Sequence, residues 1–440
     1  MIETQDYKVF SLHNFDQIPQ LNKHLSAEQI RAIEVVGTVL PFKVNNYVID
    51  ELINWEDIPN DPMFILTFPQ KDMLEEKHYN LVDNALKNNI LQSELKTIIK
   101  SIRAELNPNP AGQLDHNVPV MDGQRLEGVQ HKYDQTLLFF PSHGQTCHAY
   151  CTFCFRWPQF IGDKNLKFAQ NETTQVIEYI KRHPQITDIL FTGGDPMTMS
   201  ASRLKAYIEP FLSPELDHIQ TIRIGTKSLS YWPYRFINDK DTEELMDLFK
   251  QITKAGKHLS FMAHLNHPDE LKTEAVQVAI KNIKELGAEI RTQSPIMRHI
   301  NDKACVWRDM WKLQVNLGLI PYYMFIARDT GAQHYFSVPL VKAWQIFNDA
   351  YRQVSGIART VRGPSMSAHP GKIEIVGPAT IHGEEVLTLN FIQGRNSDWV
   401  RRPFFAEMDT EAIWLDDLKP AFGKKRFFFE TELIDDVKLN

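Results

Sequence analysis

The stretch QTCHAYCTFCFRWPQF, residues 145–160, decides how the rest of this 440-residue chain is interpreted. It contains three of the four cysteines, Cys147, Cys151 and Cys154, in the spacing C-x3-C-x2-C. Thiolates are the ligands that iron–sulfur clusters prefer, and a [4Fe–4S] cube contains four irons. Three cysteines would leave one iron without a protein ligand, so that this iron could bind a reacting molecule. The spacing therefore predicts a [4Fe–4S] cluster with one open coordination position.

A zinc site is the alternative interpretation of the same stretch, with His143 or His148 as the fourth ligand. Zinc sites usually combine two separated ligand pairs, and the sequence contains no second pair. The fourth cysteine, Cys305, lies far beyond the other three and has no cysteine near it. In this alternative the protein would be a zinc-stabilised binding protein without catalytic activity.

Composition limits the partners and the compartment. Lys and Arg number 48 against 55 Asp and Glu, which gives a net charge of -7, and no basic block stands out. This charge pattern argues against a nucleic-acid partner. The first residues lack the pattern of a secretory signal, and no apolar run approaches the ~20 residues that span a bilayer. We therefore expect no membrane association and a cytoplasmic location, where thiols and an oxygen-sensitive cluster persist.

Residues 1–112 are predicted to form a helical N-terminal domain. Ser26 precedes an apolar pattern over residues 27–37, and helical spacing continues through a long run from Asp83 to Leu106. The sequence PNDP, residues 59–62, marks a turn between them. No catalytic motif is visible here, so the simplest interpretation is a helical cap.

Residues 113–365 alternate short apolar strands with helical patterns, which favours parallel βαβ units and an α/β fold. The predicted strands are Leu137–Pro141, Asp188–Thr192, Thr221–Gly225, Leu259–His264, Glu289–Gln293 and Pro321–Ala327, and the predicted helices include Thr173–Arg182, Thr242–Ala255 and Thr273–Leu286. Closing six such strands gives a partial (β/α)6 barrel. Reactive residues of such barrels gather on the loops after the strands, and the motifs of this chain fall there. Residues 366–440 form a small C-terminal extension with a hairpin and an aromatic tail, which we expect to pack as a lid or an oligomer contact.

Gly193, Gly194 and Asp195 follow the second predicted strand. Glycines let a backbone approach a ligand closely, and the aspartate could accept from a ligand ammonium. A simple turn that closes a strand is the alternative. Placed one βα unit after the cysteine loop, GGDP resembles the S-adenosylmethionine (SAM) binding motif of radical SAM enzymes. That resemblance implies that SAM binds the open iron and is cleaved to a radical that removes a substrate hydrogen.

The resemblance extends to the lysine 2,3-aminomutase family of radical SAM enzymes. The sequences PNDP, HKY, GGDP, RIGTK, HLNHP and PYY occur in that family's order between about residues 50 and 376. It implies an isomerase that uses SAM and pyridoxal 5′-phosphate (PLP) to move an amino group between adjacent carbons of an amino acid. It also implies an electron donor such as flavodoxin or ferredoxin, and a homo-oligomer. A radical SAM enzyme without PLP, catalysing another rearrangement or an elimination, is the alternative.

Four further site residues follow from this resemblance. Arg156 matches the family's arginine for the substrate carboxylate, a role that suits the bidentate guanidinium. Lys372 matches the PLP lysine, and His264 and Gln293 match positions that line the SAM pocket. The alternatives are a surface ion pair for the arginine, a solvated lysine at a hairpin start, and a structural histidine.

Three departures from the family's pattern weaken PLP binding and the use of lysine. The family's arginine toward the PLP phosphate falls near Thr136, so that contact is either lost or supplied by Lys132 or another group. The glycine-rich run before the PLP lysine is reduced to one glycine. The family binds the distal ammonium of lysine with two aspartates. In this sequence one of these positions is occupied by Arg328, or by its neighbour Asp329, and the other by Ser365. We therefore expect a substrate other than lysine.

The cysteine pattern generates a first test. Anaerobically purified protein should contain about four irons and four sulfides per chain. Cys151→Ser should lose the cluster and all SAM cleavage, because a serine hydroxyl is a poor iron ligand, whereas Cys305→Ser should keep both. Loss of iron from Cys305→Ser would contradict the open iron, because a fourth thiolate would then occupy its position. Zinc without labile sulfide in the wild type would support the zinc alternative.

Overall fold

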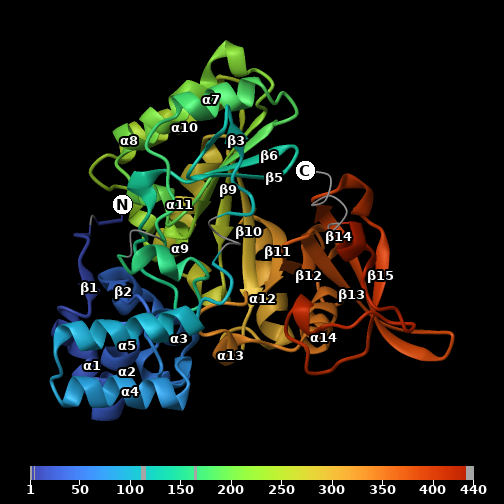
Figure 1. The fold of residues 1–440 in the computed structure, drawn as a ribbon. Coiled ribbons are helices and arrows are strands. Elements are labelled where there is room, and N and C mark those ends of the chain that lie inside the picture. Colours follow the sequence, from blue (N-terminus) through green and yellow to red (C-terminus); the bar gives the residue numbers. More distant parts are fainter. Residues whose placement is uncertain (1, 4, 111–114, 163–165, 433–440) are drawn as a thin grey trace. The chain divides into compact units, whose positions relative to one another are not determined.

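The structure, a computed structural model, describes residues 2–3, 5–110, 115–162 and 166–432. It divides into two units, drawn in Figure 1: the first comprises Met1–Arg291 with Asp329–Tyr335, and the second comprises Thr292–Arg328 with Phe336–Asn440. The predicted boundary between residues 112 and 113 lies outside the described residues. The division into an N-terminal domain, a barrel and an extension stays a prediction.

Parallel strands form the centre of the first unit, as the alternating pattern predicted. The strands pair in the order β5-β6-β7-β8-β9. Their bounds are β5 (Val129–Tyr133), β6 (Thr136–Phe139), β7 (Asp188–Phe191), β8 (Thr221–Thr226) and β9 (His258–His264). β6 to β9 are mutually parallel, and β5 joins β6 antiparallel. The prediction of parallel βαβ units is confirmed here, whereas closure into a six-stranded barrel stays a prediction.

The register of these strands explains the core of the first unit. Leu137, Ile189, Ile222 and Leu259 lie side by side on successive strands and are fully buried. Because successive side chains of a strand point to opposite faces, apolar residues at every second position give the strands one apolar face, which packs against helices. The covering helices are α7 (Thr174–Lys181), α8 (Ala201–Ile208), α10 (Thr242–Lys254) and α11 (Glu274–Glu285) (Figure 1). The loops that follow β6 to β9 carry the motifs singled out above.

The N-terminal region is helical, as predicted, with one correction. Its helices are α1 (Pro19–His24), α2 (Ala27–Val39), α3 (Pro62–Thr67), α4 (Glu76–Lys87) and α5 (Gln92–Glu105), accompanied by the short strands β1 (Val9–Ser11) and β2 (Lys43–Asn45). Ser26 and Gln29 form the capping box that starts α2. The helix predicted from Asp83 to Leu106 is wrong as a single element. The chain breaks it at Asn89, whose φ of 47° is a left-handed conformation that asparagine tolerates.

The second unit is a mixed sheet with two long helices. The strands pair in the order β11-β12-β13-β14-β15, with β11 and β12 parallel and the others antiparallel. Their bounds are β11 (Ile320–Ile326), β12 (Arg362–Ser367), β13 (Gly371–Ile381), β14 (Glu384–Gly394) and β15 (Pro403–Glu407), and the helices are α12 (Ala304–Asn316) and α14 (Leu340–Tyr351). The predicted hairpin is confirmed as β13 and β14. The boundary between the two units falls within β10 (Glu289–Ile296).

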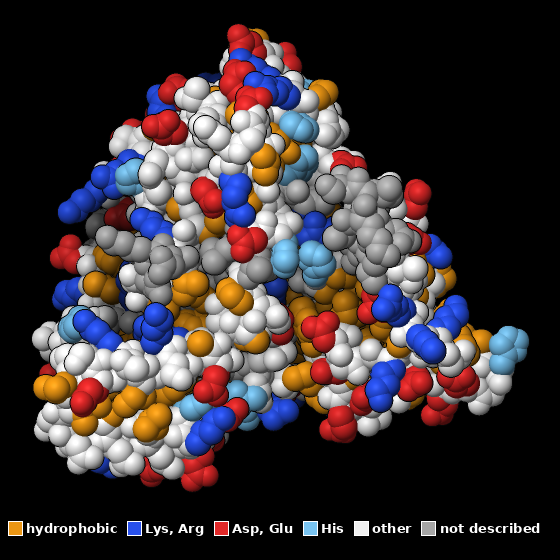
Figure 2. Space-filling view, in the orientation of Figure 1, with side chains coloured by type: hydrophobic (Ala, Val, Ile, Leu, Met, Phe, Trp, Pro, Cys, Tyr) orange, Lys and Arg blue, Asp and Glu red, His pale blue; other side chains and the backbone are white. Residues whose placement is uncertain are grey.

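The aromatic tail packs onto this hairpin sheet as far as it is described. Phe429 lies 5.3 Å from Phe391 and 5.5 Å from Phe404 between ring centroids, and the Arg402 guanidinium covers the Phe428 ring at 3.9 Å. The expectation that the tail packs is therefore confirmed up to residue 432. In the described part of the chain, no helix is both long and apolar enough to cross a membrane. Figure 2 shows basic and acidic side chains interspersed on the face that it draws.

Candidate active site

The three cysteines of the loop after β6 are free thiols, and each is half-buried. Burial raises the pKa of Cys151 to about 12 and that of Cys154 to about 11. The pKa of Cys147 is raised by burial and by the nearby Asp195, Cys154 and Cys151. Three adjoining thiolates repel one another, so they require positive charge, which cluster irons supply. This donor set fits a [4Fe–4S] cluster.

The described residues contain no group of three His, Cys, Asp or Glu side chains converging as ligands of one metal ion would. A cluster does not require that convergence, because each thiolate binds a different iron. The two histidines considered as zinc ligands have other partners. His143 Nδ1 lies 2.9 Å from the Tyr207 hydroxyl, and His148 Nδ1 lies 2.8 Å from the Ser228 hydroxyl. Burial lowers the pKa of His148 to about 3, so this imidazole is neutral.

The N-terminal region holds the cysteine loop in place. Lys43 Nζ donates to the Cys147 carbonyl at 2.7 Å, and the Lys43 carbonyl accepts from the Tyr150 amide at 2.8 Å. The Thr152 hydroxyl donates to the Ile65 carbonyl at 2.7 Å. The expectation of a helical cap without a site role was therefore incomplete. No sequence motif could have revealed that this region supports the cysteine loop, because most of these contacts use backbone atoms.

Gly193 and Gly194 approach the cysteine loop itself, within the same unit. A Cβ on Gly194 would lie 2.4 Å from the Thr146 nitrogen and 2.5 Å from the Thr146 oxygen. A Cβ on Gly193, whose φ is +138°, would lie 2.2 Å from the Gln145 side-chain nitrogen. The Asp195 amide donates to the Thr146 carbonyl at 2.7 Å. The glycines thus let two loops pack backbone to backbone, a reason that the sequence alone did not indicate.

Asp195 has a carboxylate that protein groups already surround. It is 2% exposed and accepts from the amides of Met197, Lys227 and Ser228 and from the hydroxyls of Thr226 and Ser228, at 2.8 to 3.0 Å. These five donors join the loops after β7 and β8. A ligand ammonium would have to compete with them, so any contact of GGDP with a ligand falls to its backbone.

His264 ends β9 and faces the cysteine loop, with its ring 5.5 Å from that of Phe153. Burial and the Lys227 charge hold the pKa of His264 well below its usual value, so the ring is neutral. Asn266 accepts from Lys227 Nζ through Oδ1 at 2.8 Å, which turns its amide nitrogen toward His264 Nε2 at 3.2 Å. Since Nε2 accepts, Nδ1 carries the proton. His264 can therefore offer a neutral donor to a ligand carboxylate or hydroxyl.

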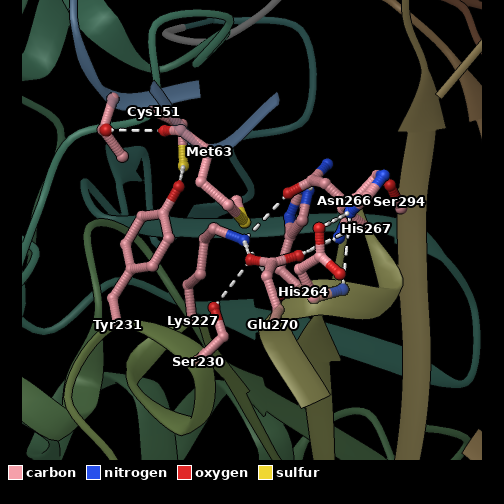
Figure 3. Close-up of polar contacts among 12 residues, drawn as sticks. Met63, Cys151, Lys227, Ser230, Tyr231, His264, Asn266, His267, Glu270 and Ser294 are labelled. Atoms are coloured by element: carbon pink, nitrogen blue, oxygen red, sulfur yellow. Dashed lines mark hydrogen bonds and ion pairs between the residues drawn. The ribbon is translucent and has the colours of Figure 1, made fainter. Parts of the chain in front are cut away.

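A buried polar network that sequence reasoning missed lies beside Cys151 (Figure 3). Lys227 forms an ion pair with Glu270, donates to Asn266, and places Nζ 4.3 Å from the centre of the Tyr231 ring. The Ser230 hydroxyl donates to Glu270 at 2.7 Å. The motifs RIGTK and HLNHP marked two of the stretches involved, but Tyr231 and Glu270 lie outside both.

Arg156 is buried beside the cysteine loop. Its guanidinium carbon lies 4.3 Å from the centre of the Phe140 ring, and its backbone amide donates to the Cys154 sulfur, which favours the thiolate. The first unit thus brings together the three cysteines, the glycine loop, Arg156 and His264. Asp329 also belongs to this unit, where its carboxylate accepts a hydrogen bond from the side-chain amide of Asn109 at 2.9 Å.

The other predicted site residues lie in the second unit. Lys372 is the second residue of β13, where its Nζ donates to Gln393 Oε1 at 2.9 Å and lies 4.4 Å from the centre of the Tyr323 ring. Ser365 on β12 is fully buried. Gln293 on β10 and Arg328 after β11 are half-buried.

In sequence, the chain is similar to enzymes of the aminomutase class. A putative L-lysine 2,3-aminomutase of Aquifex aeolicus is 29% identical over 411 residues, which are 93% of this chain and 94% of that protein. The L-lysine 2,3-aminomutases of Fusobacterium nucleatum and Clostridium subterminale are 28% and 26% identical, over about half of each chain. The predicted resemblance to lysine 2,3-aminomutases is confirmed, and these relatives belong to the predicted enzyme class.

No family model matches the sequence. Among solved structures, a radical SAM methyltransferase from Sphaerobacter thermophilus aligns with a TM-score of 0.38 and 14% identity, covering 65% of this chain and 93% of that one. Streptococcus suis SuiB bound to S-adenosylmethionine aligns with a TM-score of 0.35 and 12% identity, over 62% and 56% of the two chains.

The contact between the glycine loop and the cysteine loop can be tested with Gly194→Ala. The added methyl would meet Thr146 backbone atoms, which cannot rotate away. We expect the cysteine loop to shift, with less iron bound per chain and a stability loss of about 1–3 kcal/mol. Gly356→Ala is the matched control, because a Cβ there has nothing within 4 Å. Iron analysis and thermal unfolding measure both effects, and wild-type iron content in Gly194→Ala would refute the proposed contact.

Proposed function

We propose that this protein is a radical SAM enzyme that moves an amino group between C2 and C3 of an amino acid other than lysine. One observation carries the proposal. Three free cysteines in the C-x3-C-x2-C spacing share one half-buried loop, packed against the glycine loop of a parallel βα unit. The similarity to aminomutases along most of the chain supports the type of rearrangement.

The first unit would hold the cluster and SAM. Cys147, Cys151 and Cys154 are the cluster ligands, and a cluster bound there supplies the electron that cleaves SAM on its open iron. The Gly193–Gly194 backbone and the Nδ1–H group of neutral His264 are the SAM contacts that we propose in the first unit. An external donor such as flavodoxin or ferredoxin would reduce the cluster. We also propose that the protein works as a homo-oligomer.

Lys372 is the proposed attachment point of PLP, which stabilises charge and unpaired electrons next to a substrate nitrogen when it is bound. The amine of Lys372 lies over an aromatic ring and is oriented by a neutral amide, Gln393. Thr136, where the family has its phosphate arginine, donates to the Asp188 carboxylate at 3.0 Å. Arg223 forms an ion pair with the same carboxylate, so its positive charge is already compensated. The absence of an uncompensated cation from this cluster of described residues favours the PLP-free radical SAM enzyme as second candidate.

Arg156 and Arg328 are the proposed substrate residues. Arg156 would bind the α-carboxylate, because a buried guanidinium makes strong bidentate bonds to a carboxylate. Arg328 is assigned to the distal end of the substrate from the family resemblance alone. Its neighbour Asp329 already accepts from Asn109, which supports assigning the substrate contact to the arginine. A cation at this place favours a substrate with a second carboxylate, such as glutamate.

The PLP assignment predicts a covalent adduct. Protein incubated with PLP and reduced with borohydride should carry the cofactor on Lys372, and peptide mapping should locate it. Lys372→Ala should lose the adduct. If the wild type cleaves SAM but never forms an adduct, the PLP-free candidate replaces the aminomutase.

The substrate assignment predicts discrimination against lysine. Like charges at a desolvated site cost several kcal/mol, or roughly a thousandfold in affinity. Amino acids should be assayed anaerobically with 5′-deoxyadenosine and β-amino acid as readouts. Arg328→Asp should shift preference toward lysine, whereas Arg352→Asp, an exposed arginine of the same unit, should leave it unchanged. Fastest turnover of lysine by the wild type would refute the assignment.

A further inference from the structure

Tyr231 places a hydroxyl next to one of the three cluster cysteines. It ends the short helix α9 (Ser228–Tyr231) after β8, is 1% exposed, and its hydroxyl oxygen lies 3.7 Å from Cys151 Sγ, a hydrogen bond to sulfur (Figure 3). In the free protein the thiol donates. A cysteine that ligates iron has lost its proton, so the hydroxyl must then donate to the sulfur.

Backbone contacts fix the position of this tyrosine. Its amide donates to the Lys227 carbonyl at 2.9 Å, and its carbonyl accepts from the Asn45 side chain at 2.9 Å. Asn45 also donates to the His148 carbonyl in the cysteine loop at 3.2 Å. One asparagine therefore ties the segment of Tyr231 to the loop of Cys151, which keeps the hydroxyl and the sulfur together.

A buried cation lies on the face of the same ring. Lys227 Nζ is 4.3 Å from the ring centre, at cation–π distance, and Glu270, Asn266 and the His264 carbonyl hold it there. Positive charge at the ring face withdraws electron density from the phenol, which makes its hydroxyl a stronger donor.

We propose that Tyr231 is a positioning residue that donates a hydrogen bond to the Cys151 thiolate and thereby raises the reduction potential of the cluster, with Lys227 strengthening the bond. Hydrogen bonds to cluster sulfurs and nearby charge are established determinants of potential. The reduced cluster carries one more negative charge, so a donor to its thiolate stabilises the reduced form more than the oxidised form. The inference rests on the proposed function.

The test compares Tyr231→Phe with the matched control Tyr234→Phe, a nearby tyrosine whose ring packs on Trp232 and Tyr47. Phenylalanine keeps the ring over Lys227 and removes only the hydroxyl. In an anaerobic redox titration followed by electron paramagnetic resonance, Tyr231→Phe should show a more negative midpoint potential. At the wild-type midpoint, its ratio of reduced to oxidised cluster should fall about three- to tenfold, the effect of one hydrogen bond. Tyr234→Phe should titrate like the wild type.

A second substitution keeps the hydroxyl and should shift the midpoint potential in the opposite direction. Tyr231→3,5-difluorotyrosine has a stronger donor and should move the midpoint to more positive values, which decides the question if Tyr231→Phe does not assemble a cluster. Wild-type midpoints in every variant that holds a cluster would overturn the inference while leaving the proposed function intact. A wild type that binds no iron and sulfide would instead refute the proposed function.

Discussion

The backbone contact between the glycine loop and the cysteine loop is the constraint on which the site depends. The Asp195 amide donates to the carbonyls of Gly144 and Thr146, and Gly194 leaves no room for a side chain between the two loops. A loop with three cysteines has no regular structure of its own, so its shape must come from neighbours. Parallel strands provide them, because the loops after β6 and β7 start at the same edge of the sheet.

A second set of hydrogen bonds connects Asp195 to the cysteine loop through Ser228 and His148. Asp195 accepts from the Ser228 hydroxyl, and that hydroxyl lies 2.8 Å from Nδ1 of His148 in the cysteine loop. The neutral state of His148 matters here, because a second buried cation near Lys43 would be strongly unfavourable. Asp195 thus supports the cysteine loop in two ways, directly through its backbone amide and indirectly through its carboxylate and Ser228. Burial raises the pKa of Asp195, and its many donors oppose that effect because they stabilise the carboxylate.

Sequence patterns predicted the parallel strands and the cysteine site, because periodicity and ligand spacing are local properties. They placed β6 to β9 correctly and put the cysteine loop and GGDP after β6 and β7, whereas most of RIGTK lies inside β8 and Gln293 lies inside β10. They did not reveal Lys43 and Asn45 as supports of the loop, since these residues lie more than a hundred positions from the atoms that they contact. The break at Asn89 was missed for a different reason, because the apolar spacing continues across it while the backbone turns left-handed.

Lys227 and Lys372 each lie over an aromatic ring, and their hydrogen-bond partners separate their proposed roles. Lys227 over Tyr231 forms an ion pair with the carboxylate of Glu270. Lys372 over Tyr323 is paired with the neutral amide of Gln393, its cross-strand neighbour in the β13–β14 hairpin. Covalent attachment of a cofactor requires an unprotonated amine, and a neutral acceptor does not oppose that form. A carboxylate partner therefore suits a fixed charge beside Cys151 in the first unit, and an amide partner suits the lysine that we propose as the cofactor attachment point in the second.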